Sequence, residues 1–308
     1  MKYDELNNTV DEARKKLNIL LEQNPTYFGN DKDVLTRIKT VLSNSNSIEK
    51  PTIHTTTEIM RSVDLTILDK SATEEAVMEV ARRAAHEHCA TVCVYPEHIP
   101  HVNKVMSELN VTDVPPIAVV GFPFVNNSKQ SELTIDQTNE AIKLGAKEID
   151  MVLPITFKDD SESYLDHFNY LKSVIDVAHK QNIPVKVILE TAYLTDEQIV
   201  LSSIISKIAG ADWVKTSTGF AEVDKFATGR TSEEKGATPK AVALMRKAVG
   251  YTTTNSLGVD KPMGVKASGG VRNREQALAV LEAGADRIGA SGGINVENTP
   301  NNKAPLGY

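Results

Sequence analysis

The chain has 308 residues, of which 41% are hydrophobic and 24% charged, so it can bury a large core as one α/β barrel or two smaller domains. Its formal net charge of -7 argues against a nucleic-acid partner, because no basic stripe is present to neutralise phosphates. No apolar run approaches the roughly 18 residues that a membrane span needs, and the polar start predicts no signal peptide. We therefore expect a cytoplasmic protein without a membrane partner.

Residues 1–62 are predicted to form an N-terminal helical extension rather than a domain. Apolar side chains recur at helical spacing in two stretches, and a polar stretch follows them. The first face consists of Leu6, Val10, Ala13, Leu17 and Leu20, and the second of Val34, Leu35, Ile38, Val41 and Leu42.

From Val63 onward, apolar runs typical of strands alternate with amphipathic stretches typical of helices. Strands are predicted at 63–68, 90–95, 117–122, 148–153, 185–190, 212–216, 263–267 and 286–290. Helices are predicted near 73–88, 135–145, 160–181, 195–209, 237–250 and 273–284. Three capping boxes are predicted at helix starts, from Ser71 to Glu74, from Thr134 to Gln137 and from Thr195 to Gln198.

Eightfold alternation of strand and helix predicts a (β/α)8 TIM barrel over residues 63–292. The alternative is a doubly wound open sheet, which favours fewer strands and a glycine-rich turn after the first one, where this chain has Leu68-Asp69-Lys70-Ser71. Residues 293–308 are predicted to be a flexible tail, too rich in Asn, Pro and Gly for the helix that closes such a barrel. We expect a degenerate or missing eighth helix, with the N-terminal helices or a partner subunit covering the surface that it leaves.

Five predicted strands carry an ionisable residue where an apolar one is expected. They are Asp64, Asp150, Lys186, Lys215 and Lys266. Burying an unpaired charge is costly, and charged residues near the carboxyl ends of barrel strands are typical of catalytic sites. A set of buried ion pairs that serves only the fold is the alternative interpretation.

Lys215 and Lys266 stand in short apolar runs at the ends of successive predicted strands. An amine attacks a carbonyl group only when it is unprotonated, and a free lysine, with a pKa of about 10.4, is protonated at neutral pH. A second ammonium about 6 Å away disfavours the protonated form by about 3 kcal/mol at an effective dielectric constant of about 20. We therefore predict that Lys266 helps Lys215 to lose its proton and form a Schiff base, while Asp150 relays protons through water.

Small residues after the seventh and eighth strands predict a phosphate site at the usual anion position of a barrel. They are Gly269, Gly270, Gly289, Ser291 and Gly292, for which tight turns alone are the alternative interpretation. No cofactor or metal is expected, because the histidines at 86, 88, 98 and 101 give no three-ligand zinc set. Cys89 and Cys93 fit neither a disulfide framework nor a zinc knuckle, and both are expected to be reduced thiols.

Eight short motifs occur in order between about Val63 and Ser291. They are DLTIL at 64–68, VCVYP at 92–96, GFP at 121–123, EIDMVLP at 148–154, KVILET at 186–191, VKTSTGF at 214–220, GVKASGGVR at 264–272 and RIGAS at 287–291. On these motifs the chain resembles the 2-deoxyribose-5-phosphate aldolases, which are class I aldolases on a (β/α)8 barrel.

The resemblance implies that Lys215 forms the Schiff base, that Lys266 lies beside it and that Asp150 relays protons. Asp64, Cys93 and Lys186 fall on motif positions that line the family's site in supporting roles, although Cys93 also fits a buried small hydrophobe. The implied activity is that of a lyase in deoxyribonucleotide and carbohydrate catabolism. It reversibly cleaves 2-deoxy-D-ribose 5-phosphate to D-glyceraldehyde 3-phosphate and acetaldehyde, so the expected partners are phosphosugar and aldehyde substrates, and a homo-oligomer is left open.

Two positions depart from the resemblance or extend it. Phe220 stands where some members have a lysine that helps to hold the phosphate, so phosphate affinity is expected to depend more on the loop backbone. Tyr308 ends the chain, and members whose C-terminal tyrosine reaches the site use it in proton abstraction; a disordered end is the alternative. Another class I aldolase, or a catalytically silent barrel acting as a binding protein, is the alternative function.

Overall fold

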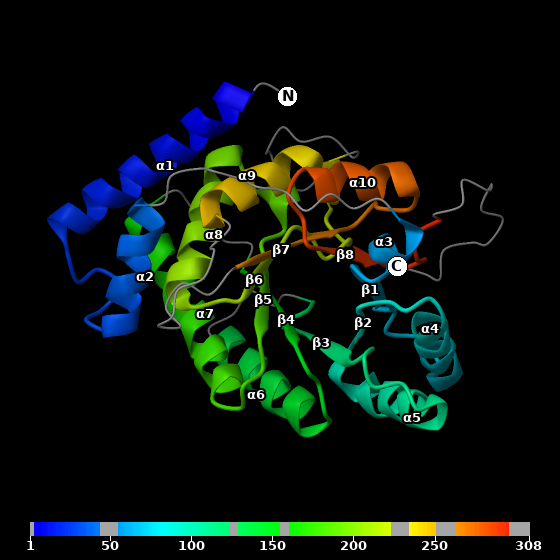
Figure 1. The fold of residues 1–308 in the computed structure, drawn as a ribbon. Coiled ribbons are helices and arrows are strands. Elements are labelled where there is room, and N and C mark those ends of the chain that lie inside the picture. The colour runs from blue at the N-terminus through cyan, green and yellow to red at the C-terminus, as the bar shows by residue number, and fades with distance from the viewer. Residues whose placement is uncertain are drawn as a thin grey trace.

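Eight parallel strands close into a barrel in which each strand pairs with its neighbours in sequence (Figure 1). The computed structural model describes residues 3–43, 55–123, 129–154, 160–222, 234–250 and 263–295. The strands are β1 (Val63–Thr66), β2 (Thr91–Val94), β3 (Pro116–Val120), β4 (Ile149–Val152), β5 (Val185–Ile188), β6 (Trp213–Lys215), β7 (Gly264–Ser268) and β8 (Arg287–Ala290). All eight overlap the predicted runs, and the TIM barrel is confirmed.

A helix follows each of the first seven strands and packs outside the barrel (Figure 1). These helices are α4 (Glu74–His86), α5 (Ile99–Leu109), α6 (Gln130–Lys143), α7 (Ser161–His179), α8 (Asp196–Ala209), α9 (Pro239–Val249) and α10 (Arg274–Glu282), with short 3₁₀ turns η1 (Pro96–His98) and η2 (Thr191–Tyr193). The residues described after β8, 291–295, contain no helix, and none of the described helices is long and apolar enough to cross a bilayer.

Only one of the three predicted capping boxes starts its helix as expected. Thr195 caps α8 in a full capping box with Gln198. At α4 the cap is Thr73, because Asp69 binds the backbone and hydroxyl of Ser71 in a turn of its own. Thr134 lies inside α6, where its hydroxyl donates to the Gln130 carbonyl, so the predicted box there is wrong.

The three helices before β1 are α1 (Tyr3–Gln23), α2 (Lys32–Ser43) and α3 (Thr56–Met60). α1 packs on α8 and α9, and α2 packs on α8 (Figure 1). The reason lies in α8, whose residues 199–209 are all buried, so its outer face needs a second layer of apolar cover. The expectation that α1 and α2 cover the place of an eighth helix is therefore wrong, and cover by a partner subunit stays a prediction.

Two arginines of the extension bind carbonyl groups in the last turns of the helices that they cover. Arg37 Nε donates to the Ile208 carbonyl of α8 at 2.8 Å, and Arg14 Nη2 donates to the Lys247 carbonyl of α9 at 3.1 Å. The last carbonyls of a helix lack intrahelical partners and carry partial negative charge, which these guanidinium groups satisfy. The extension is thus held by polar contacts as well as by its apolar faces.

We expect Arg37→Leu to lower the free energy of unfolding by about 1–2 kcal/mol, because the mutation leaves the Ile208 carbonyl without this charged donor. Urea denaturation measures the change. Lys39→Ala, which removes an exposed cation from the same helix, is the control and is expected to change stability little. Equal urea concentrations at the midpoint of unfolding for the two variants would contradict a stabilising role for the Arg37 contact.

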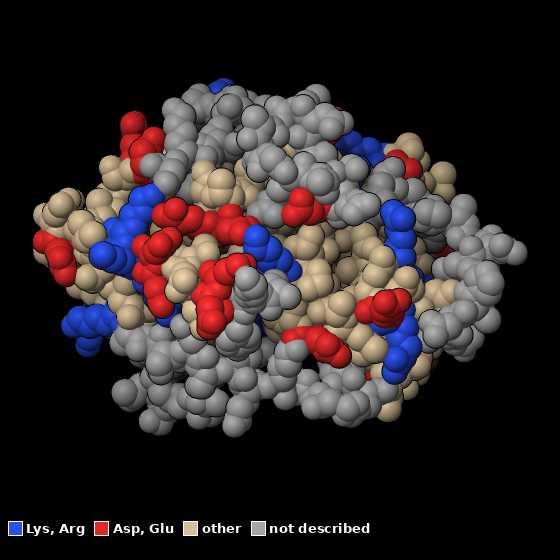
Figure 2. Space-filling view, turned by 90° about the horizontal axis from the view of Figure 1, so that it is seen from above, with Lys and Arg blue, Asp and Glu red and all other residues tan. Residues whose placement is uncertain are grey.

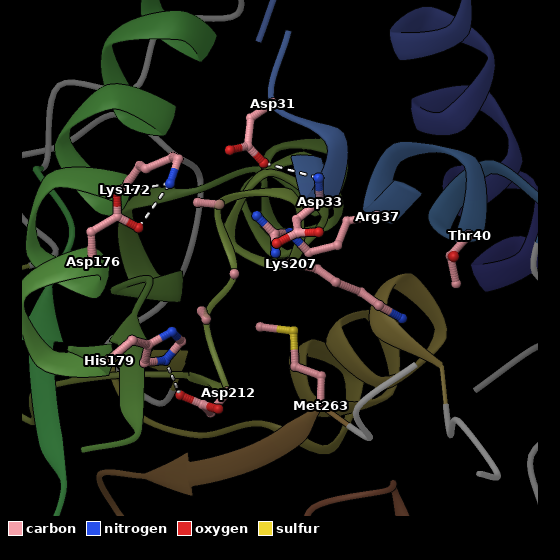
Figure 3. Close-up of a pocket in the computed structure, with 13 residues that line it drawn as sticks. Asp31, Asp33, Arg37, Thr40, Lys172, Asp176, His179, Lys207, Asp212 and Met263 are labelled. Atoms are coloured by element: carbon pink, nitrogen blue, oxygen red, sulfur yellow. Dashed lines mark hydrogen bonds and ion pairs between the residues drawn. The ribbon is translucent and has the colours of Figure 1, made fainter. Parts of the chain in front are cut away.

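A cavity of about 360 Å³ lies between α2, α7 and the turn from α8 to β6 (Figure 3). Four of its lining residues bind one another: Lys172 binds Asp176 at 2.7 Å, and His179 Nε2 lies 2.8 Å from Asp212 Oδ2. Asp212 immediately precedes β6, so the cavity opens at the amino ends of the strands, away from the carboxyl ends where barrel enzymes hold substrate. Seen from above Figure 1, the described residues show acidic and basic side chains side by side, without a continuous basic stripe on the face drawn (Figure 2).

Candidate active site

The five ionisable residues predicted from the strands lie together inside the barrel. Lys215 Nζ lies 2.9 Å and Lys266 Nζ 2.8 Å from the same atom, Asp150 Oδ2. Lys186 Nζ lies 3.1 Å from Asp150 Oδ1, and Lys266 Nζ lies 2.6 Å from Asp64 Oδ2. Lys215 is 2% exposed and the other four residues are fully buried, so the site excludes bulk water.

Strand register brings these residues together. Lys215 of β6 is directly opposite Lys266 of β7, and Asp150 of β4 is directly opposite Lys186 of β5. Residues paired in this way point to the same face of the sheet, which here is the barrel interior. Because both lysine nitrogens bind one oxygen of Asp150, they lie within 5.7 Å of each other, the sum of the two distances.

Two further charged residues, Glu148 and Arg287, complete the cluster one layer deeper. Lys186 forms an ion pair with Glu148, and Arg287 pairs with Asp64 and, at 3.3 Å, with Glu148 Oε1. The Arg287 guanidinium also lies over the Trp213 ring, 5.5 Å from its centroid. We call the whole set the lysine–carboxylate cluster; it comprises Asp64, Glu148, Asp150, Lys186, Lys215, Lys266 and Arg287.

Charge pairing decides the protonation of most of this cluster. Burial alone would raise the pKa of Asp150, but the ammonium groups of Lys186, Lys215 and Lys266 outweigh it and hold that pKa well below its usual value. The pKa of Asp64 is lowered in the same way, chiefly by Lys266 and Arg287. Burial would lower the pKa of Lys266, yet Asp150 and Asp64 raise it well above its ordinary value. The pKa of Lys186 is also raised against the effect of burial, chiefly by Asp150 and Glu148. Both carboxylates and these two lysines are therefore ionised at neutral pH.

The mouth of the barrel has an apolar side. Five buried side chains form a cluster separate from the main core: Leu68, Tyr95, Val119, Val152 and Ile188. Phe122 and Phe220 pack against it, with their ring centroids 5.3 Å apart. Phe220, which departs from the family pattern, therefore forms part of an apolar wall rather than an anion site.

A cavity of about 710 Å³ lies beside the mouth, between the turns that follow β6 and β7 and the start of α9. Gly219, Gly269 and Gly270 line it together with the cationic residues Lys235 and Arg272. A Cβ atom at residue 236 would lie 2.3 Å from the Gly269 carbonyl oxygen, and the Ala237 N–H donates to that oxygen at 2.9 Å. The two loops are thus packed closely enough to fix the cavity wall.

The predicted phosphate residues fall into two groups. Gly269 and Gly270 line the cavity with positive φ values of 90° and 80°. Gly289 instead faces Ser268, whose Oγ lies 2.1 Å from where a Cβ would be, and the Gly292 carbonyl accepts a hydrogen bond from Arg83 at 2.7 Å. Ser291 is buried. The structure therefore places two of the five residues on the cavity wall.

Comparison with known proteins places this site in a family. The model of the DeoC/LacD family aldolases matches residues 59–298. The chain belongs to this family. It is 40% identical over 245 residues to the deoxyribose-phosphate aldolase of Thermococcus kodakarensis, covering 79% of this chain and 97% of that protein. It is 42% identical over 240 residues to the deoxyribose-phosphate aldolase of Clostridium tetani, covering 78% of this chain and 97% of that protein.

A solved structure agrees with this assignment. The tetrameric deoxyribose phosphate aldolase from Aeropyrum pernix superposes with a TM-score of 0.60 at 27% identity, covering 85% of this chain and 94% of that chain. The matched region contains the barrel and the lysine–carboxylate cluster, so the resemblance found in the motifs is confirmed at the level of the family.

Cys93 lies on β2 and is fully buried beside the cluster of this aldolase. Burial raises the pKa of its thiol, and the negative charge of Asp150 raises it further. The thiol is therefore protonated at neutral pH and acts as a small neutral group rather than a nucleophile. Tyr308 lies outside the described residues.

Three charged residues of the site were missed from the sequence. Glu148 and Arg287 occupy the interior parity of β4 and β8, two positions before Asp150 and Gly289 respectively, so residue parity was the available clue. Glu190 follows β5 at the same parity as Lys186 and is 4% exposed. Its raised pKa and contacts with the turn after Lys215 come from burial in the folded chain, which parity alone does not reveal.

Proposed function

We propose that the chain is a class I aldolase that cleaves 2-deoxy-D-ribose 5-phosphate to D-glyceraldehyde 3-phosphate and acetaldehyde through a Schiff base on Lys215. The observation that carries the proposal is the pair of lysine nitrogens bound to one oxygen of Asp150 in a water-excluded barrel. The names of the relatives support the choice of substrate.

Charge balance favours Lys215 as the amine that reacts. The cluster sets four cationic side chains, Lys186, Lys215, Lys266 and Arg287, against the three carboxylates of Asp64, Glu148 and Asp150. Among the ion pairs of the described residues, Lys215 has Asp150 as its carboxylate, whereas Lys186 and Lys266 each bind two. Loss of a proton from Lys215 therefore leaves every carboxylate paired and the cluster neutral.

The neutral amine of Lys215 attacks the C1 carbonyl carbon of the open-chain sugar, and loss of water from the carbinolamine gives an iminium ion. Removal of the proton from the C3 hydroxyl then breaks the C2–C3 bond, whose electron pair moves to C2 and forms an enamine. Glyceraldehyde 3-phosphate leaves, C2 is protonated, and water releases acetaldehyde from Lys215. Overall, the hydroxyl proton of C3 ends on C2.

Asp150 and Lys266 have distinct parts in these steps. Asp150, ionised and 2.9 Å from Lys215 Nζ, relays protons through a water molecule to and from the carbinolamine and C2. Lys266 keeps its proton and disfavours a second ammonium beside it, which favours the neutral amine of Lys215. Asp64 and Lys186 hold Lys266 and Asp150 in place, and Cys93 fills the space beside them.

We infer that the phosphate group binds in the cavity of about 710 Å³. Consecutive positive φ values at Gly269 and Gly270 give a backbone concavity of the kind that binds anions, and Lys235 and Arg272 supply positive charge. Gly289, Ser291 and Gly292 do not line this cavity, and their part in holding the phosphate stays a prediction. Phe220 then contributes apolar contact at the mouth, and Lys235 and Arg272 supply the positive charge that a lysine at position 220 would give.

The substrate assignment predicts that kcat/KM for deoxyribose 5-phosphate exceeds that for unphosphorylated deoxyribose by about 10²-fold, since two charge-assisted contacts contribute about 3 kcal/mol. Lys235→Gln with Arg272→Gln should remove most of this preference. Lys240→Gln, which changes a cation of α9 outside the cavity lining, is the control. Equal kcat/KM for both sugars would favour the alternative, another class I aldolase with a different aldehyde substrate.

We also propose that the enzyme is cytoplasmic and forms a homo-oligomer. The tetrameric relative from Aeropyrum pernix supports the second point. Tyr308 stays a predicted proton carrier for C2, since a positioned phenol contributes about 10²-fold or more. A catalytically silent barrel is the remaining alternative, and it predicts no reaction of acetaldehyde with Lys215.

A further inference from the structure

Glu190 lies two residues after the end of β5 and has a backbone conformation that residues other than glycine usually avoid. Its φ and ψ are 54° and 63°, in the left-handed region, at the start of η2. Such a conformation costs roughly 1 kcal/mol or more in a non-glycine residue and persists where surrounding contacts hold it. The Thr191 N–H donates to the Thr216 carbonyl at 2.9 Å, which fixes this corner to the strand that carries Lys215.

The Glu190 carboxylate binds the turn that follows Lys215. The backbone N–H of Thr218 donates to both carboxylate oxygens, with its nitrogen 3.3 Å from Oε1 and 3.1 Å from Oε2. The Thr218 hydroxyl also donates to Oε2. The same hydroxyl accepts the Phe220 N–H at 3.1 Å. One buried carboxylate thus fixes the turn from Thr218 through Gly219 to Phe220, which lines the cavity and the apolar wall of the mouth.

We propose that Glu190 is a positioning residue of the aldolase, which in its ionised form holds the turn from Thr218 to Phe220 after Lys215. The inference rests on the proposed function. Among the described residues, Lys215 is the charged group that acts on this carboxylate, and the other polar groups that act on it belong to Thr218.

Ionisation of Glu190 falls within the working range of pH. Burial raises its pKa from 4.5 to about 7, an effect that the Thr218 hydrogen bonds and the charge of Lys215 only partly offset. A protonated carboxyl group has a donor of its own and accepts fewer hydrogen bonds, so the hold on Thr218 weakens as pH falls. Between pH 4.5 and about 7 the folded chain binds this proton more tightly than the unfolded chain does. Stability therefore decreases as pH rises through that window, and the ionised group costs stability above it.

Glu190→Gln tests the inference through the pH profile of kcat/KM for deoxyribose 5-phosphate. The parent enzyme is expected to lose activity as pH falls through about 7. The variant should lack the part of this acid limb that protonation of Glu190 causes, and it should be slower by about 10²-fold at pH 8, as misplacement of a site by about 1 Å permits. Its melting temperature at pH 8 should equal or exceed that of the parent, because the costly buried charge is gone. If Glu190 served only the fold, Glu190→Gln would lower the melting temperature and leave the pH profile unchanged.

Thr218→Val and Thr218→Ser form a matched pair, because the first removes the hydroxyl that links Glu190 to Phe220 and the second keeps it. Valine should lower kcat/KM as Glu190→Gln does, and serine should restore it. An acid limb that persists in Glu190→Gln, with a rate within about twofold of the parent, would overturn the inference. Trapping of acetaldehyde on Lys215 in the parent enzyme separates this outcome from failure of the aldolase assignment itself.

Discussion

Replacing Lys215 by methionine is expected to lower the rate of sugar-phosphate cleavage by more than about 10⁴-fold, the scale on which loss of a covalent nucleophile acts. Methionine keeps a flexible apolar stem of similar length but has no amine to attack the carbonyl carbon. Asp150 keeps Lys186 and Lys266 as partners, so the barrel is expected to remain folded. Steady-state kinetics with circular dichroism measures both effects.

Lys186→Met is the matched control, because Lys186 is also buried and also binds Asp150. Its loss removes a partner from both Asp150 and Glu148, so we expect a lower free energy of unfolding but continued Schiff-base formation. A Lys215→Met enzyme that keeps kcat within about tenfold of the parent would contradict the assignment of Lys215 as nucleophile.

Replacing Lys266 by methionine is expected to move the rate optimum to higher pH by about two units. The neighbouring ammonium lies within 5.7 Å of Lys215 Nζ, where it disfavours a second positive charge by about 3 kcal/mol at an effective dielectric constant of about 20. Without it, the charge that disfavours a second ammonium group beside Asp150 is gone. The pH profile of kcat from neutral to alkaline pH measures the shift.

Lys266→Arg is the control, because it keeps a positive charge between Asp64 and Asp150. The pH optimum of this variant is expected to stay near that of the parent, even if the larger guanidinium group lowers the maximal rate. A pH profile left unchanged by Lys266→Met would mean that the neighbouring charge does not help Lys215 to react.

The barrel could be predicted because its strands are apolar runs with a regular helix after most of them. Among the described helices that follow a barrel strand, the pattern did not predict α5, which has Pro100 in its first turn. There the missing N–H of proline is harmless, although the same residue ends helices elsewhere. At Thr134 the error is the opposite one: the capping pattern predicts a helix start, but Thr134 lies inside the longer helix α6.

Five members of the site could be predicted for a simple reason, which is that they interrupt apolar strands: Asp64, Asp150, Lys186, Lys215 and Lys266. Their pairing distances could not, because a single sequence does not fix the register that sets Lys215 opposite Lys266. The role of Glu190 depends on a left-handed corner and on Thr218, which belongs to a different strand end. The docking site of the extension depends likewise on the fully buried α8.

Reductive trapping with acetaldehyde and borohydride, followed by peptide mass mapping, tests directly whether Lys215 forms the Schiff base. Borohydride reduces an iminium ion to a stable secondary amine, so the nitrogen that formed the Schiff base keeps the carbon skeleton of the aldehyde. We expect one ethyl group per chain, on Lys215, with loss of activity in proportion to labelling. Labelling mainly on Lys266 or Lys186, or full activity after exhaustive treatment, would contradict it.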